Sequence, residues 1–172
     1  MSGRRPWGDS FRLHYHWHQT APEPCNCGTG TIHYDAVGRR YALHNRFANA
    51  QRRLGYVLDE AAGVAHVFEW RDGRLACHRH RTDRQVRLAD QVAEGDSCGQ
   101  GLVPGGEVRF VEFREPGDHD RWLWCLDDRD RPLRFFTWTH RGAIQVLHDL
   151  DRLEAGVAPD EAAFRPPADC EG

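Results

Sequence analysis

The sequence predicts a mostly β protein built on an antiparallel sheet of about ten strands. Short runs rich in aromatic and β-branched residues recur about every ten to fifteen positions along the chain. Gly, Pro and Asp separate these runs, and no long stretch has the periodicity of an amphipathic helix. This combination is typical of strands joined by tight turns, with little helix.

Turn-forming dipeptides set the boundaries of the expected strands. Val37-Gly38, Asp72-Gly73 and Arg141-Gly142 are expected to close hairpins, and the polar stretch 127–132 is expected to form a surface turn. The expected strands are residues 11–18, 30–37, 40–47, 54–59, 64–70, 75–80, 108–114, 121–126, 133–140 and 143–150.

The remaining segments carry weaker signals. Residues 85–92 fit either a short helix or an irregular strand, and residues 159–164 fit one helical turn with Pro159 at its start. The glycine-rich stretch 95–106 is expected to be a mobile loop.

Length and charge narrow the classes of protein. The 172 residues fit one domain spanning 1–172. The 23 basic and 26 acidic residues are interspersed, which argues against a nucleic-acid partner because such a surface needs a basic patch. No apolar run is long enough to span a bilayer, so no transmembrane segment is expected.

The amino-terminal segment and the cysteines point to different compartments. Residues 1–24 lack the apolar core of a signal peptide, which favours the cytoplasm unless Met1 is not the start of the gene product. Six cysteines form no paired CxxC motifs, which favours disulfides over a zinc site. In a reducing compartment that preference reverses.

The aromatic residues exceed what a thin core requires. Along the expected strands Trp122 and Trp124 share one face, and Phe136 and Trp138 share another. Packing in the core is the ordinary role for such side chains, and the wall of an apolar pocket is the alternative. The candidate pocket residues are Trp17, Tyr34, Tyr41, Tyr56, Phe68, Trp122, Trp124, Phe136 and Trp138.

Several motifs resemble those of ependymin-related proteins. They are APEPC at 21–25, Tyr34-Asp35, GRR at 38–40 and FRPPADC at 164–170, of which the last is the most specific. The similarity runs loosely over residues 21–170, so the chain divides into a His-rich segment 1–24 and an ependymin-like region 25–170. The absence of any Asn-X-Ser/Thr site favours a bacterial member over a glycosylated animal protein.

The resemblance implies a fold, a ligand class and a set of disulfides. The fold is a curved antiparallel half-barrel or sandwich like that of LolA and LolB, with an apolar cavity for a lipid or another hydrophobic small molecule. It also implies secretion, calcium binding and a homodimer. The implied disulfides are Cys25 with Cys125 and Cys77 with Cys170, which leaves Cys27 and Cys98 as a third pair.

A second resemblance concerns catalysis. The chain is also similar to the LolA-fold enzyme of violacein biosynthesis, through Tyr34-Asp35, Arg46-Phe47, GYVL at 55–58 and PLR at 132–134. That resemblance implies a cofactor-independent enzyme acting on an aromatic, indole-type intermediate, as an alternative to simple binding. The candidate acids and bases are His14, His16, Tyr34, Asp35, Glu60 and His66.

Histidines in alternation suggest a third function, metal binding. On a strand His14, His16 and His18 would share one face, and His78 and His80 form a second such pair, an arrangement that suits zinc or copper. A solvated polar face is the alternative. For calcium the candidates are Asp127, Asp128 and Asp130, although the turn lacks the glycine and distal glutamate of an EF-hand.

Overall fold

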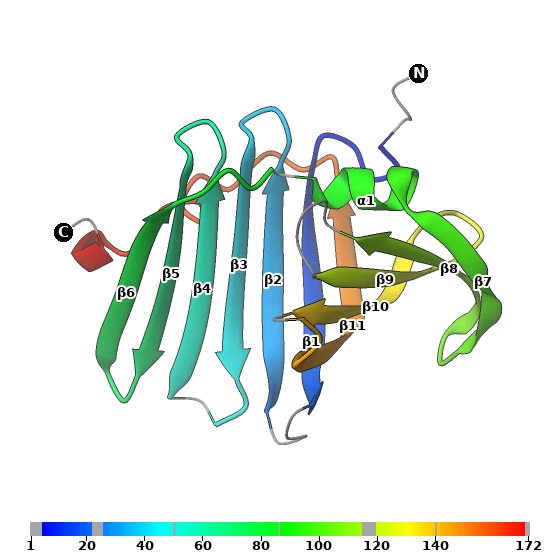
Figure 1. Ribbon diagram of the computed structural model, residues 1–172, viewed down its shortest axis with the longest axis horizontal. Helices are drawn as coiled ribbons and strands as arrows, with labels where there is room; N and C mark the ends of the chain where they lie inside the picture. The colour runs from blue at the N-terminus through cyan, green and yellow to red at the C-terminus, as the bar shows by residue number, and fades with distance from the viewer. Residues whose placement is uncertain are drawn as a thin grey trace.

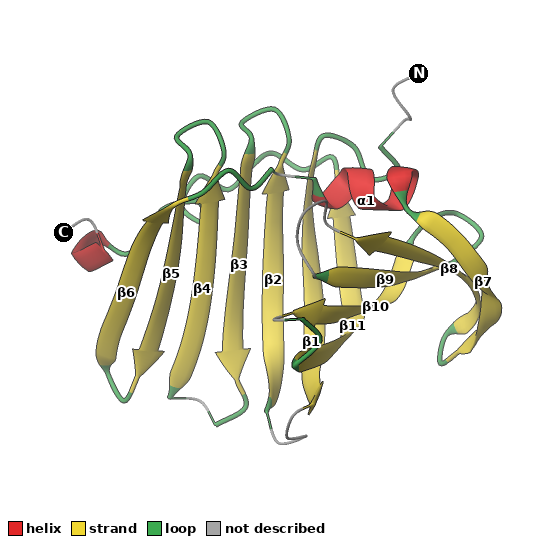
Figure 2. Cartoon of the chain, viewed as in Figure 1, coloured by secondary structure: helices red, strands yellow, loops and turns green. Residues whose placement is uncertain are grey.

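The expectation of a mostly β protein with little helix is confirmed. A computed structural model of the protein describes residues 5–21, 26–49, 51–85, 87–114, 120–139 and 141–170. Within these ranges eleven strands form one antiparallel sheet, accompanied by a single short α-helix (Figures 1 and 2). The elements in chain order are β1 (Ser10–Ala21), β2 (Cys27–Asp35), β3 (Arg40–Phe47), β4 (Arg52–Asp59), β5 (Val64–Arg71), β6 (Arg74–Arg81), α1 (Leu88–Glu94), β7 (Asp96–Val103), β8 (Gly106–Arg114), β9 (Arg121–Leu126), β10 (Pro132–Thr139), β11 (Ile144–Ala155) and the 3₁₀ turn Ala168–Cys170.

The sheet consists of two meanders joined at one seam. The strand order is β6-β5-β4-β3-β2-β1-β11-β10-β9-β8-β7. The first meander, β1 to β6, runs from the β1–β11 seam to one edge, and the second, β7 to β11, runs from the other edge back to the seam. The sheet is curved and unclosed, with β6 and β7 at its two edges. Figure 1 shows β8 to β10 turned away from the direction of β2 to β6, with α1 lying in front of the sheet.

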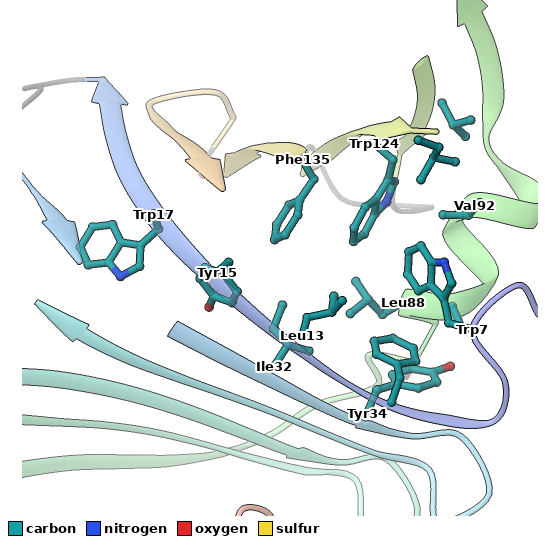
Figure 3. Close-up of a cluster of buried hydrophobic side chains, with 14 of the residues drawn as sticks. Trp7, Leu13, Tyr15, Trp17, Ile32, Tyr34, Leu88, Val92, Trp124 and Phe135 are labelled. Carbon is teal, nitrogen blue, oxygen red and sulfur yellow. The ribbon is translucent and has the colours of Figure 1, made fainter. Parts of the chain in front are cut away.

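Helix α1 closes one end of the concave face. It lies on the connection from β6 to β7, and it buries Leu88, Ala89 and Val92. In the close-up, Leu88 and Val92 lie near Trp7 and Trp124, while Trp17 lies at the other end of the cluster (Figure 3). The main hydrophobic core is therefore concentrated beneath the helix.

A second, smaller core lies on the convex face. Phe164 and Cys170 pack there against Ala42, Val57 and Phe68. The segment after β11 crosses behind the sheet from β11 towards β6, where the 3₁₀ turn lies (Figure 1). The Nε2 atom of His44 lies 2.8 Å from the carbonyl oxygen of Ala163 on this segment. We call residues 156–170 the C-terminal strap.

The hairpin turns form where the sequence predicts them. Asp72 and Gly73 both adopt positive φ, 52° and 76°, as the tight β5–β6 turn requires. In the β2–β3 turn the left-handed residue is Arg39, with φ 55°, while Asp35 accepts a hydrogen bond from the backbone N–H of Gly38.

The expectation of a loop at 95–106 is wrong, because most of this segment is strand β7. Its backbone pairs with β8 from Asp96 to Val103, with an irregularity between Ser97 and Gly99. Gly99 takes φ 140° at that irregularity. The ambiguous segment 85–92 contributes the first part of α1.

Candidate functional site

The concave face of the sheet encloses a cavity of about 470 Å³. This volume lies in the range of about 300–1,000 Å³ that is usual for small-molecule sites. A cross-strand row of Ile32, Leu43 and Tyr56 contributes to one wall, because these residues lie opposite one another on β2, β3 and β4. Trp122, Phe135 and Val146 contribute to the facing wall from the second meander. The cavity is thus enclosed by both halves of the curved sheet.

The structure brings four of the nine candidate pocket residues to this cavity. Trp17, Tyr41, Tyr56 and Trp122 all line it. Trp17 packs edge-on against Phe47, and the ring of Tyr41 is tilted against that of Tyr56. Aromatic rings therefore form part of the cavity wall.

The other five candidates lie elsewhere. Tyr34 and Trp124 are buried in the core at the helix-covered end. Phe68 packs on the convex face beneath the C-terminal strap. Phe136 and Trp138 do share a face, as predicted, but it is the convex one, because side chains alternate along β10 and Phe135 points into the cavity.

Polar side chains also line the cavity, and several of them are hydrogen-bonded to other side chains. The Tyr15 hydroxyl donates to Oδ1 of Asn45 at 2.7 Å, and the Trp124 indole N–H donates to Oε1 of Gln91 at 3.1 Å. Asn45 and Gln91 both line the cavity. Pairing of this kind keeps the wall compatible with an apolar ligand.

His148 is the exception within the described wall. Its ring is buried, stacks on Phe135 with centroids 4.0 Å apart, and has Nε2 3.3 Å from the Thr137 hydroxyl oxygen. Nδ1 has no hydrogen-bond partner. Burial lowers the pKa of His148 to about 3, so the imidazole is neutral near pH 7.

Sequence reasoning missed Phe135, Thr137 and His148, although a signal for His148 was present. It lies two residues after Val146 and two before Leu150 on the expected strand 143–150, and alternate residues of a strand share one face. Extending that alternation to position 148 would have put an imidazole in the apolar wall.

The histidines do not assemble into a metal site. His14, His16 and His18 alternate with the cavity-side residues Tyr15 and Trp17 and so lie on the convex face. His14 is paired with Glu154, at 3.0 Å between Nε2 and Oε2.

The second histidine pair is far away and on the other side of the sheet. His78 lies in the cross-strand row of Val67 and Tyr56, which is on the concave face. Strands β1 and β6 are five places apart in the sheet, or roughly 24 Å at the usual strand spacing. Throughout the described ranges, no group of three or more His, Cys, Asp or Glu side chains is placed to hold a metal ion.

Asp127 and Asp130, in the acidic turn after β9, form hydrogen bonds with arginine residues. Asp127 accepts hydrogen bonds from the backbone N–H groups of Arg129 and Arg131, each at 2.9 Å. Asp130 accepts from the Arg109 guanidinium. Burial acts to raise the pKa of Asp127, but its contacts with Arg131 and Arg129 outweigh that effect, so the pKa is lowered.

One of the implied disulfides is present. Cys77 on β6 is bonded to Cys170 at the end of the C-terminal strap. Cys27 and Cys98 are exposed free thiols, so the third pair is not formed. Cys125 is a buried free thiol, and Cys25, its expected partner, lies outside the described ranges.

None of the six candidate acids and bases lines the cavity. Asp35 is held by the Arg40 guanidinium, and burial raises the pKa of Tyr34 to about 12. His14 and His16 lie on the convex face together with His66, which occupies the same cross-strand row as Val57. Glu60 follows β4 and pairs with Arg39.

Comparisons with known proteins show a shared fold and no family. No family model matches the chain, and no curated protein matches it. An uncharacterized conserved protein from Thermus thermophilus superposes with a TM-score of 0.56 at 12% identity, over 97% of this chain and 91% of that one. At this identity the likeness concerns the fold alone.

Two other solved structures are similar at a TM-score of 0.45. One is the Pseudomonas aeruginosa MucA/MucB complex, at 17% identity over 98% of this chain and 59% of that one. The other is a putative outer membrane lipoprotein-sorting protein domain from Vibrio parahaemolyticus, at 11% identity over 92% and 89% of the two chains. The resemblance to ependymin-related proteins gains no support from these comparisons. In the described part of the chain, no helix has the length and apolar character needed to cross a membrane.

Proposed function

We propose that the protein binds a hydrophobic small molecule or a lipid in the cavity of its curved sheet. The observation that carries this proposal is the cavity itself, a space of about 470 Å³ whose wall includes aliphatic and aromatic side chains from both meanders. A concave surface with such side chains offers apolar area that a hydrophobic ligand would remove from water.

A binding role explains the side chains of the cavity wall better than a catalytic role does. The pair of side chains in the described wall that most resembles a nucleophile and its base is Thr137 and His148. With a pKa of about 3, His148 is a weak base near pH 7, and no third group orients its ring, since Nδ1 has no partner. The polar pairs of the cavity therefore favour a binding protein over the biosynthetic enzyme.

The disulfide supports a setting outside the reducing cytoplasm. A bond between Cys77 and Cys170 persists where the environment is oxidising, as in secreted and periplasmic proteins. We place the protein in such a compartment as part of the proposal.

The test is to fill the cavity without disturbing the sheet. Leu43→Trp adds an indole to the cavity wall and is expected to abolish binding of a fluorescent fatty-acid analogue or another apolar probe. Leu147→Trp places the same indole on the convex face of β11, opposite Phe136, and serves as the matched control that retains binding. Equal binding by the two variants, or no binding by the wild-type protein, would refute the proposal.

A further inference from the structure

The charged residues of the cavity wall are mostly cationic. Among the described lining residues, Arg52, Arg84 and Arg87 stand against the single carboxylate of Asp120. The remaining lining side chains are uncharged, including His148. Within the described wall, a negatively charged group on a ligand would therefore find its partners at these arginines.

Arg84 occupies a special place among the three. It lies on the segment that connects β6 to α1, and about half of its side chain is exposed, 49%. It pairs with Asp120, which precedes β9, with Nη2 and Oδ2 3.4 Å apart. It also interacts with the hydroxyl of Tyr56, whose ring lines the cavity. The guanidinium thus links the two halves of the sheet at the boundary between solvent and the apolar wall.

The other two arginines are less exposed. The Arg52 guanidinium lies 4.1 Å from the centroid of the Phe47 ring and pairs with Glu69. Arg87 pairs with Glu94 within its own helical segment. The side chain of Arg84 is 49% exposed, against 28% for Arg52 and 23% for Arg87. Of the three, Arg84 is therefore the most accessible to a charged head group that reaches the cavity from solvent.

We infer that the ligand is an anionic amphiphile, whose apolar part lies in the cavity and whose carboxylate or phosphate is bound by Arg84 in place of Asp120. A guanidinium presents parallel N–H donors that match the two oxygens of such a group, and these charge-assisted hydrogen bonds are stronger than neutral ones. A molecule whose tail lies against Tyr56 has its head within reach of Arg84, because both residues line the same cavity and their side chains interact. This inference rests on the proposed function and adds the chemistry of the head group.

The experiment compares probes with one tail and different heads. Dodecanoate, dodecanol, dodecylamine and dodecyl phosphate are titrated into the full chain below their micelle concentrations, with the fluorescence of the cavity tryptophans Trp17 and Trp122 as the readout. At least one of the two anions, dodecanoate or dodecyl phosphate, is expected to bind about tenfold more tightly than dodecanol. Dodecylamine is expected to bind more weakly than dodecanol or the anions. Added salt should reduce the difference in binding affinity between the anions and dodecanol, because salt screens the interaction with the guanidinium.

Two substitutions give effects of opposite sign. Arg84→Gln should reduce the affinity for the anions to about the level of dodecanol and so remove the preference for the anions. Asp120→Asn removes the competing carboxylate and should strengthen anion binding several-fold. Arg129→Gln, on the turn after β9 and outside the cavity wall, is the control and should behave like the wild-type protein.

The outcomes separate the inference from the proposed function. If dodecanol binds as well as both anions, or if Arg84→Gln keeps the anion preference, the inference fails while the hydrophobic cavity stands. If none of the four probes binds, both fail. A preference for the phosphate over the carboxylate, lost in Arg84→Gln, supports the inference and identifies the anion.

Discussion

Tyr15 and Asn45 are joined by a hydrogen bond that passes over Gly30, from the hydroxyl group to Oδ1 at 2.7 Å. The three residues lie directly opposite one another on β1, β2 and β3. A Cβ atom at Gly30 would come within 2.4 Å of the Tyr15 ring and 2.2 Å of Asn45 Oδ1. The absence of a side chain on β2 is therefore what allows the tyrosine to lie across the sheet and satisfy its hydroxyl.

The first prediction concerns this glycine. Gly30→Ala should lower the free energy of unfolding by about 1–3 kcal/mol, because the methyl group displaces the Tyr15 ring and breaks its hydrogen bond. Urea denaturation measures the change. Gly101→Ala, on the edge strand β7, meets only the Phe110 ring and should cost less. Similar losses in the two variants would contradict the role given to Gly30.

The second prediction is a pH dependence of stability. Burial lowers the pKa of His148 from its ordinary 6.5 to about 3, so between these values the unfolded chain takes up a proton that the folded protein does not. The free energy of unfolding should therefore fall as the pH falls from about 6.5 towards 3. His33, whose pKa burial lowers to about 4, acts in the same direction.

His148→Phe isolates the contribution of His148. The variant should show a pH dependence that is shallower by up to about 1.4 kcal/mol per pH unit, because its side chain cannot bind a proton. Urea titrations between about pH 7 and pH 4 measure both curves. Parallel curves for the two proteins would show that His148 is accessible to protons in the folded state.

The third prediction concerns the disulfide that fastens the C-terminal strap. Cys170→Ser should lower the free energy of unfolding by about 2–5 kcal/mol, since Cys77 and Cys170 are 93 positions apart and their bond constrains a long loop of the unfolded chain. A reductant should destabilise the wild-type protein and leave Cys170→Ser unchanged. Cys27→Ser, at an exposed free thiol, is the control. Equal stability with and without reductant would show that the bond contributes nothing.

The fourth prediction concerns thiol reactivity. Cys27 and Cys98 are exposed, whereas Cys125 is buried and its pKa is raised to about 11, mainly by desolvation. Because the thiolate is the reactive form, iodoacetamide should modify Cys27 and Cys98 in the native protein and reach Cys125 only after denaturation. Peptide mapping of the alkylated protein gives the answer. If Cys125 stays unmodified in denaturant until a reductant is added, it is part of a disulfide after all.

Strand positions were predictable because their signals are local. The bounds of Arg40–Phe47 and Arg121–Leu126 match the expected strands, and each is rich in aromatic or aliphatic residues and is followed or preceded by polar turns. Strand β7 was not predictable in this way. Gly99 and Gly101 weaken its intrinsic preference, and the strand exists because β8 supplies a ladder of backbone hydrogen bonds.

The cavity was harder to predict than the strands. Alternation shows that Phe136 and Trp138 share a face, but which face is concave depends on the curvature of the whole sheet and on the path of α1 across it. Those are long-range properties. The role of Arg84 depends on Asp120 and Tyr56 from distant segments, and no local motif marks it.

The seam between β1 and β11 has a consequence for how the molecule is made. It joins Leu13 to Leu153, so the first strand of the chain finds one of its two neighbours only after the last has been synthesised. Until then the edge of β1 that pairs with β11 is unsatisfied, and the two meanders that line the cavity are not joined. Contacts this far apart in sequence slow folding, and a chain arrested before β11 would present an open apolar surface to chaperones and proteases.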